Sequence, residues 1–199
     1  MNKRGFTLME MLIVLGIIVV IFTVLLTSNK KYSEKLNLKN KTYNALLMLR
    51  QAQVYSLGVK AGGTPATFNA SYGVSFNMSS PGQFVFFTDE NNNGKYEGPG
   101  CQGECGDNEQ ASVYPLLNNV TIQKVCGIYN NSEQCSPQSS LQNVDITFKR
   151  PRSEASIKFI KTDGSFDLTL LPPATVYFIS QTGLISSIKV DATGGVSIQ

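Results

Sequence analysis

The sequence predicts an α+β protein in which one long N-terminal helix precedes a domain of antiparallel β-strands. Residues 11–26 carry no charge, and residues 29–57 contain neither proline nor glycine, so a helix can continue through both stretches. Beyond Thr64 the pattern changes to short aromatic and β-branched runs that alternate with turn-forming residues. A series of strands behind a single helix is typical of the α+β class.

The apolar N-terminal run is long enough to cross a membrane. It comprises roughly 21 residues if residues 6–9, ahead of Glu10, are included, and about 20 span the hydrocarbon core. We expect a transmembrane segment at about residues 6–27, as the first part of a helix over residues 6–58. The second part is predicted to pack on the globular domain, because its apolar residues recur every three or four positions. These residues are Tyr43, Leu46, Leu47, Val54 and Leu57.

The remaining residues, 59–199, are predicted to form one antiparallel β domain. A cysteine-containing excursion at about residues 97–138, rich in glycine, asparagine, serine and glutamine, interrupts it. Turn sequences such as Thr162-Asp163-Gly164 and Gln181-Thr182-Gly183 separate the later strands. Strands are expected at residues 72–76, 83–87, 120–125, 144–149, 156–161, 166–170, 175–180, 184–190 and 196–198.

Composition argues against catalysis and against nucleic-acid binding. The chain has no histidine, which removes the commonest general base and the commonest metal ligand. Its net charge is +3 without a dense basic stripe, so no nucleic-acid partner is expected. We expect the chain not to be an enzyme and to require no cofactor.

Four cysteines, all within residues 101–135, indicate an oxidising compartment. Two local disulfides are favoured by the spacing, one between Cys101 and Cys105 and one between Cys126 and Cys135. Crossed pairing remains open. Zinc binding is a weaker alternative, because the spacing lacks the Cys-x2-Cys pairs of structural zinc sites.

Residues 89–97 contain a possible calcium loop. Side-chain oxygens at its first, third and fifth positions precede Gly94, which is the order found in calcium loops. The twelfth position is Gly100, where a bidentate glutamate would be needed, so a site requires an acidic residue to fold back. The alternative is a plain hairpin turn, which Asn-Gly favours. The candidate ligands are Asp89, Asn91, Asn93, Lys95 through its carbonyl, and Glu97.

Three interpretations of the N-terminus compete. Lys3 and Arg4 precede the apolar run, as in a secretory signal, but no A-x-A-like cleavage site follows the run. An uncleaved membrane anchor is the second interpretation. Neither accounts for Glu10, because a carboxylate inside lipid costs about 2.5–3.5 kcal/mol or more. Glu10 is therefore a functional candidate that needs a cationic partner.

The third interpretation is that residues Gly5-Phe6-Thr7-Leu8-Met9-Glu10 and the apolar run resemble a type IV prepilin. The resemblance implies that residues 1–5 are a leader that prepilin peptidase removes by cleaving between Gly5 and Phe6. It implies N-methylation of Phe6, and an assembly role for Glu10 in neutralising the amino terminus of a neighbouring subunit. The implied fold is a long helix packed on an antiparallel β-sheet domain.

Later segments are similar to GspH/FimT-like minor pseudopilins. The residues concerned are the phenylalanine-rich strand leading into 88–94 and the final segment 188–198. The resemblance implies a minor pilin or pseudopilin in a type II secretion pseudopilus or a type IV pilus. Implied partners are other pilin subunits, prepilin peptidase, the inner-membrane assembly machinery, and membrane lipid before assembly. The alternative is a membrane-tethered extracellular domain that binds calcium or another ligand.

The expected location is the cytoplasmic (inner) membrane, crossed once, with the C-terminal domain outside the cytoplasm and later in a filament. The cysteines and the cleavage pattern favour this orientation. The distribution of lysines favours the opposite one, because five lysines within residues 30–41 follow the apolar run and only Lys3 and Arg4 precede it.

Overall fold

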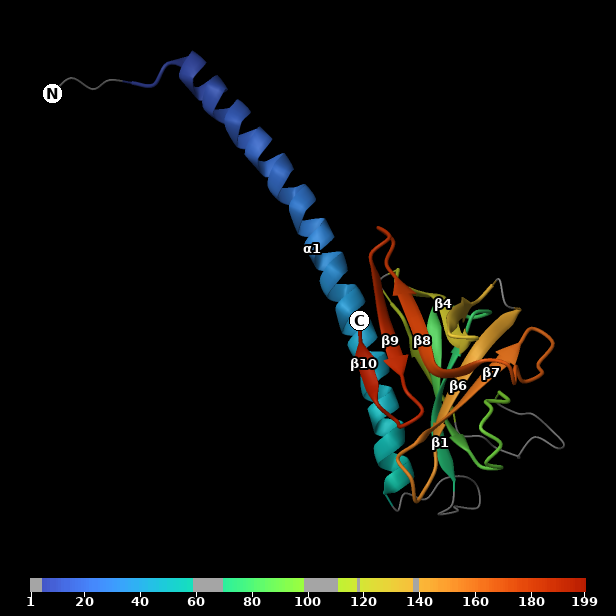
Figure 1. Ribbon diagram of the computed structural model, residues 1–199. Coiled ribbons are helices and arrows are strands. Elements are labelled where there is room, and N and C mark those ends of the chain that lie inside the picture. The colour runs from blue at the N-terminus through green and yellow to red at the C-terminus, as the bar shows by residue number, and fades with distance from the viewer. Residues whose placement is uncertain (1–4, 59–69, 99–110, 118, 138–139) are drawn as a thin grey trace.

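The computed structural model describes residues 5–58, 70–98, 111–117, 119–137 and 140–199, and for residues 26–30 it describes the helix but not the side chains. Within these ranges one helix, α1 (Leu8–Leu57), precedes ten strands. Figure 1 shows the N-terminal half of α1 projecting away from the domain and the C-terminal half lying along it. The predicted α+β class and the long N-terminal helix are confirmed.

The strands of the predicted antiparallel β domain form two five-stranded sheets. The first sheet has the order β3-β2-β1-β6-β7. Its strands are β1 (Ser71–Asn77), β2 (Gln83–Asp89), β3 (Ala111–Pro115), β6 (Leu141–Phe148) and β7 (Ala155–Lys161). The second sheet has the order β10-β9-β8-β4-β5. Its strands are β4 (Thr121–Tyr129), β5 (Ser132–Cys135), β8 (Leu171–Ile179), β9 (Ile185–Val190) and β10 (Val196–Ile198).

Helix α1 has a side-chain cap at its start and a backbone cap at its end. The Thr7 hydroxyl accepts a hydrogen bond from the backbone N–H of Glu10 at 3.3 Å and so caps the helix. The helix therefore begins at Leu8, two residues after Phe6, where the sequence analysis placed its start. At the other end the N–H of Gly58 donates to the Val54 carbonyl at 2.8 Å. With 50 residues at about 1.5 Å each, α1 is about 75 Å long.

The core lies where the two sheets and the C-terminal half of α1 meet. Phe76 of β1 contacts Phe178 of β8 edge to face across the sheets, with ring centroids 6.2 Å apart. Tyr55 of α1 packs against Tyr72 of β1 at 5.6 Å. The face of α1 that is buried in this core carries Leu38, Ala45, Leu49 and Ala52. The small alanines let the helix approach the strands closely, which holds the domain against α1.

The predicted strand at residues 166–170 is wrong. Phe166 makes one isolated bridge, to Ile160 of β7, and the chain then turns. The turn forms because the Asp167 carboxylate accepts hydrogen bonds from both the backbone N–H of Thr169, at 3.0 Å, and its hydroxyl, at 2.6 Å. An aspartate that bonds the backbone two residues on favours a turn over an extended strand. Leu168 is consequently 83% exposed.

Two strands that the sequence did not predict, β3 and β5, lie inside the expected excursion. β5 folds back on β4 through Asn130 and Asn131, whose φ angles of 46° and 63° are left-handed. Asparagine tolerates that conformation and so permits a tight hairpin. β3 pairs with β2 over residues 111–115. The described part of residues 97–138 thus contributes three strands, including β4, to the two sheets.

Candidate functional site

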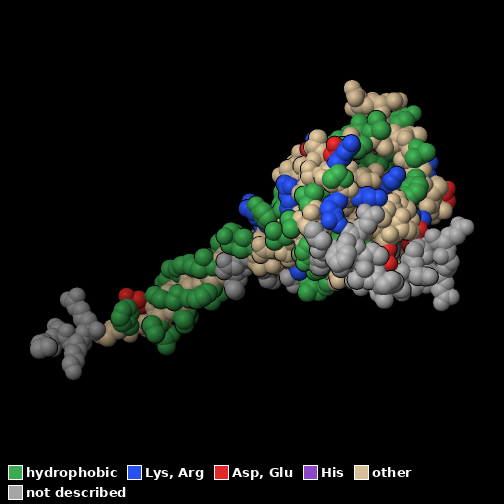
Figure 2. Space-filling model, turned by 90° about the horizontal axis from the view of Figure 1, so that it is seen from below, with side chains coloured by type: hydrophobic (Ala, Val, Ile, Leu, Met, Phe, Trp, Pro, Cys, Tyr) green, Lys and Arg blue, Asp and Glu red, His purple; other side chains and the backbone are tan. Residues whose placement is uncertain are grey.

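The projecting half of α1 is an apolar helical segment that contacts no other part of the described structure. Residues Leu8–Leu25 have the length and composition of a membrane-spanning helix, and none of that segment is buried. Figure 2 shows hydrophobic side chains along the length of this projecting part. An exposed apolar surface of this extent requires lipid or protein around it.

Glu10 carries the one charged side chain between residues 5 and 29. It lies in the first turn of α1, near the backbone N–H groups that carry the positive end of the helix dipole. That end stabilises a carboxylate only modestly, by about 0.3–1 kcal/mol at exposed sites. Once the segment is surrounded by apolar groups, the carboxylate therefore needs a cation close by.

The Gly5–Phe6 peptide bond lies ahead of the helix, in an exposed and non-helical segment. Space around Gly5 is open, because no described residue beyond its neighbours in the chain lies within 4 Å of where a Cβ would be. A peptidase binds its substrate in an extended form, so this bond is accessible in a way that a bond inside α1 would not be. Lys3 and Arg4 lie outside the described residues.

Residues 1–26 match the family model of the prokaryotic N-terminal methylation motif. The chain carries a prokaryotic N-terminal methylation motif. This motif is typical of type IV pilins and pseudopilins, which is the class that the first ten residues resemble. No curated protein and no solved structure matches the chain.

The motif is informative about the processing, the partners and the location of the chain. Such a motif is found in type IV pilin-like precursors, which prepilin peptidase processes, and it supports a precursor of this kind here. The motif implies, in general terms, interaction with the peptidase and with other pilin subunits, and it is typical of structural proteins. The apolar half of α1 is consistent with a single-pass anchor in the inner membrane.

The loop at residues 89–97 is held by its own hydrogen bonds. The Asp89 carboxylate accepts from the backbone N–H groups of Asn93, at 3.1 Å, and Gly94, at 2.9 Å. Glu97 folds back onto the loop, and its carboxylate accepts from the side-chain amides of Asn91, at 3.1 Å, and Asn93, at 3.0 Å. The structure therefore brings four of the five candidate calcium ligands together. Both asparagines, however, direct N–H groups towards Glu97.

The surroundings of this loop carry positive charge. A depression of about 170 Å³ beside Asp89 and Asn93 is also lined by Lys149 and Lys158. Lys95, the fifth candidate ligand, donates from its ammonium group to the Gly164 carbonyl at 3.3 Å. Burial raises the pKa of Asp89, and its backbone hydrogen bonds and Lys149 only partly offset this. These features favour a stable turn over a cation site.

Cys126 and Cys135 form a disulfide between facing residues of β4 and β5, with an S–S distance of 2.03 Å. This is the local pairing that the spacing favours, and it removes these two sulfurs as zinc ligands. Cys101 and Cys105 lie outside the described residues.

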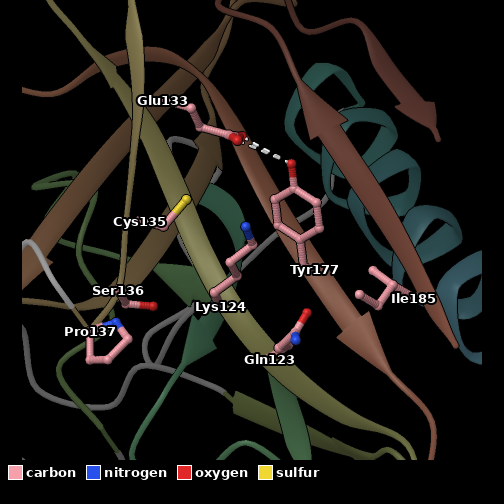
Figure 3. A pocket seen from close by; sticks show the side chains of 8 residues that line it. All are labelled: Gln123, Lys124, Glu133, Cys135, Ser136, Pro137, Tyr177 and Ile185. Atoms are coloured by element: carbon pink, nitrogen blue, oxygen red, sulfur yellow. Dashed lines mark hydrogen bonds between the residues drawn. The ribbon is translucent and has the colours of Figure 1, made fainter. Parts of the chain in front are cut away.

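A depression of about 580 Å³ lies beside this disulfide on the outer face of the second sheet. Figure 3 shows the Tyr177 hydroxyl pointing at Glu133, to which it donates at 3.1 and 3.2 Å. The Lys124 ammonium lies 4.3 Å from the centroid of the Tyr177 ring. Burial, followed by the adjacent Glu133, raises the pKa of Tyr177. These polar groups satisfy one another, and nothing in the arrangement prepares a nucleophile.

Among the described residues, Asp145 of β6 is the carboxylate whose pKa departs furthest from its ordinary value, and sequence reasoning missed it. It is fully buried, and its oxygens accept from the backbone N–H of Tyr96, at 2.7 Å, and from the Asn143 amide, at 3.2 Å. Tyr96 also packs on Phe87 of β2, with ring centroids 5.2 Å apart. Asp145 therefore holds the end of the 89–97 loop against the first sheet. Only its place in a strand rich in polar residues (Gln142, Asn143, Asp145, Thr147) could have pointed to it.

Burial raises the pKa of Asp145 to about 6 despite these hydrogen bonds. Between the unfolded value of 3.8 and about 6, the folded state holds a proton that the unfolded state has released. Stability from this group is therefore present at low pH and is lost as pH rises through about 6. We expect wild type to lose about 2.5 kcal/mol of unfolding free energy relative to Asp145→Asn between pH 4 and pH 7.5. Urea titrations at both pH values check this, and an unchanged difference would contradict it.

Proposed function

We propose that this chain is a minor pilin or pseudopilin, a structural subunit of a type IV filament system. The main support for the proposal is the N-terminal methylation motif. The motif overlaps a long apolar helical segment that the β domain does not cover. Before assembly, lipid covers that helix. On assembly, the inner-membrane machinery moves the helix into the filament core, while the β domain stays on the filament surface.

In this proposal Gly5 and Phe6 are the processing residues. Cleavage between them frees the amino group of Phe6, which is then methylated and remains cationic at neutral pH. Glu10 of a neighbouring subunit provides the counter-charge, so two groups that are each costly in an apolar core neutralise one another. Glu10 is the one charged side chain in this part of α1, which supports this assignment.

The minor-subunit assignment rests on the similarity of residues 88–94 and 188–198 to GspH/FimT-like minor pseudopilins. A type II secretion pseudopilus and a type IV pilus both fit these features. The Cys126–Cys135 disulfide supports an oxidising compartment and hence a domain outside the cytoplasm.

A second candidate function is a membrane-tethered domain that uses the 89–97 loop to bind calcium. The return of Glu97 onto Asn91 and Asn93 favours it, whereas the amide orientation and the nearby lysines oppose it. We expect that millimolar calcium shifts the melting temperature of the detergent-solubilised chain by less than about 1 °C. A saturable rise of several degrees, absent in Asp89→Asn, would establish the site.

Fractionation of cells tests the filament proposal. We expect the wild-type chain in the sheared filament fraction, in its shortened form. In a strain without prepilin peptidase activity it should stay in the membrane at full length. The proposal would be contradicted if the chain stayed entirely in the membrane of cells that have active prepilin peptidase and make filaments.

A further inference from the structure

One end of the β domain is held next to the membrane-spanning segment of α1. Figure 1 shows β8 and β9 meeting at the end of the domain that is nearer the projecting half of the helix. The Thr182 hydroxyl, in the turn between these strands, donates a hydrogen bond to the Glu34 carboxylate of α1. Glu34 follows Leu25, the last residue of the apolar segment, by nine positions, or about 14 Å along the helix. The β8–β9 turn therefore lies close to the surface of any bilayer that the segment crosses.

Two other connections are tied to the same end. The side-chain amide of Asn119, between β3 and β4, donates to the Gln181 side-chain oxygen of the β8–β9 turn at 3.0 Å. The backbone N–H of Leu116 donates to the carbonyl of Gly82, in the β1–β2 turn, at 2.7 Å. The three connections thus form one surface, which we call the proximal end. It consists of residues 78–82, 116–117, 119–120 and 180–184.

The proximal end carries no charged side chain. The sequence has no aspartate, glutamate, lysine or arginine within residues 78–88, 110–123 and 168–188. Lys161 and Asp163 lie at the end of β7 and in the turn after it, at the edge of the first sheet opposite β3. Figure 2 views the domain from the other end, where lysine and arginine side chains gather. The charge of the domain is therefore kept away from the end that faces the apolar segment.

The proximal end also exposes large apolar side chains. Leu117 and Leu184 are 59% and 38% exposed. The adjacent helix surface has the residues of a membrane interface. Tyr32 is exposed there, and tyrosine is enriched at membrane interfaces. Lys31 and Lys35 lie beside it in the sequence, and lysines of this kind attract anionic headgroups.

We propose that the proximal end rests on the phospholipid bilayer that α1 crosses, with Leu117 and Leu184 inserted among the headgroups. The headgroup layer is about 5–8 Å thick, so about 6–9 Å separate it from the level of Glu34. Membrane helices tilt by about 20° on average and by up to about 40°. A tilt of about 20–40° lowers a point about 15 Å from the helix axis by about 5–10 Å, which closes this distance.

The contact gives the membrane-bound chain a preferred posture. Removing the exposed parts of both leucines from water favours the lowered domain over the upright one by roughly tenfold. Transfer of the chain out of the membrane then requires the domain to detach from the surface first. The inference rests on the single-pass anchor and goes beyond the proposed filament function.

Tryptophan fluorescence in vesicles tests the contact, because the chain has no tryptophan of its own. The reporters are Leu117→Trp, at the proximal end, and Leu171→Trp, at the far end of β8, about 26 Å from Ile179. Both leucines are 59% exposed, so the variants are matched. The full chain is placed in vesicles of phosphatidylethanolamine and phosphatidylglycerol, with or without bromine on the upper acyl carbons.

We expect brominated lipid to lower the emission of Leu117→Trp roughly threefold and to leave that of Leu171→Trp unchanged. Equal emission of Leu117→Trp in brominated and unbrominated vesicles would overturn the inference. A blue-shifted emission without bromine quenching would place the proximal end against another copy of the chain, and would also overturn it.

A second pair of variants uses Leu184→Trp as the reporter. We expect Leu117→Asp to reduce its quenching roughly fivefold, because a carboxylate must lose water to enter the headgroup layer. Leu171→Asp should leave the quenching unchanged. Both should melt within about 2 °C of the reporter alone, since both leucines are exposed. Undiminished quenching in the variant with Leu117→Asp would refute the contact.

The outcomes for the bilayer contact and for the filament differ, because the vesicles contain no other subunit and no assembly machinery. Entry into sheared filaments in cells, without quenching in vesicles, would refute the bilayer contact and leave the filament function standing. Quenching in vesicles, without entry into filaments, would refute the filament function and leave the contact.

Discussion

Glu10→Leu is expected to reduce filament incorporation by roughly 100-fold or more, because removing one partner of a buried ion pair costs about 3–5 kcal/mol. The substitution leaves the amino group of a neighbouring Phe6 in an apolar core without a counter-charge. Membrane insertion should not suffer, since leucine is better accommodated in lipid than glutamate. The measurement is the ratio of the variant in sheared filaments to the variant in membranes.

Met11→Leu is the matched control for Glu10→Leu. It changes the next residue of the same exposed turn without changing charge, and should incorporate like wild type. Equal incorporation of Glu10→Leu and Met11→Leu would remove Glu10 from the assembly mechanism. It would favour the tethered binding domain, which needs only an anchor.

Gly194→Ala is expected to destabilise the domain by about 3 kcal/mol through a steric clash and backbone strain together. Gly194 lies in the turn between β9 and β10 with a φ of +83°, and a Cβ there would lie 2.0 Å from the Ser153 carbonyl oxygen. The Gln53 amide of α1 donates to the carbonyls of Ser153, at 3.2 Å, and Gly194, at 3.4 Å. The clash therefore falls where α1, the β6–β7 connection and the last hairpin meet.

Gly183→Ala separates the contribution of backbone strain from that of the steric clash. Gly183 has the same φ of +83°, but no described residue beyond its neighbours in the chain lies within 4 Å of where a Cβ would be. It should cost only the left-handed strain, about 1–2 kcal/mol. Urea unfolding of the detergent-solubilised variants gives both values. If Gly194→Ala and Gly183→Ala lowered the unfolding free energy equally, the clash with the Ser153 carbonyl oxygen would contribute nothing.

Much of the helix could be predicted because its signals are local. The charge-free run, the absence of proline and glycine over residues 29–57, and Gly58 give its course and its end. Tyr43, Leu47 and Val54 were expected to pack on the domain, but the structure leaves all three side chains exposed on the other side of α1. Periodicity shows that apolar residues align along a helix, but it does not show which line of them a sheet will cover.

The strands were predictable where their own side chains carry the pattern. β1, β2 and β9 are rich in branched or aromatic residues and lie close to their expected positions. β5 has the sequence Ser-Glu-Gln-Cys, and its pairing comes from the Asn130–Asn131 turn and the disulfide. Residues 166–170 look like a strand, but the Asp167 carboxylate bonds the backbone locally. Asp145 is buried by a loop from another part of the chain, which no local pattern reveals.

The N-terminal mass of the chain taken from filaments tests the central claim most directly. We predict that intact-mass and peptide spectra show a chain that begins at Phe6, with residues 1–5 absent and one methyl group on the Phe6 amine. A chain that retains residues 1–5, or that begins beyond the apolar segment at about residue 28, would contradict the account. The first would indicate an uncleaved anchor, and the second a secretory signal.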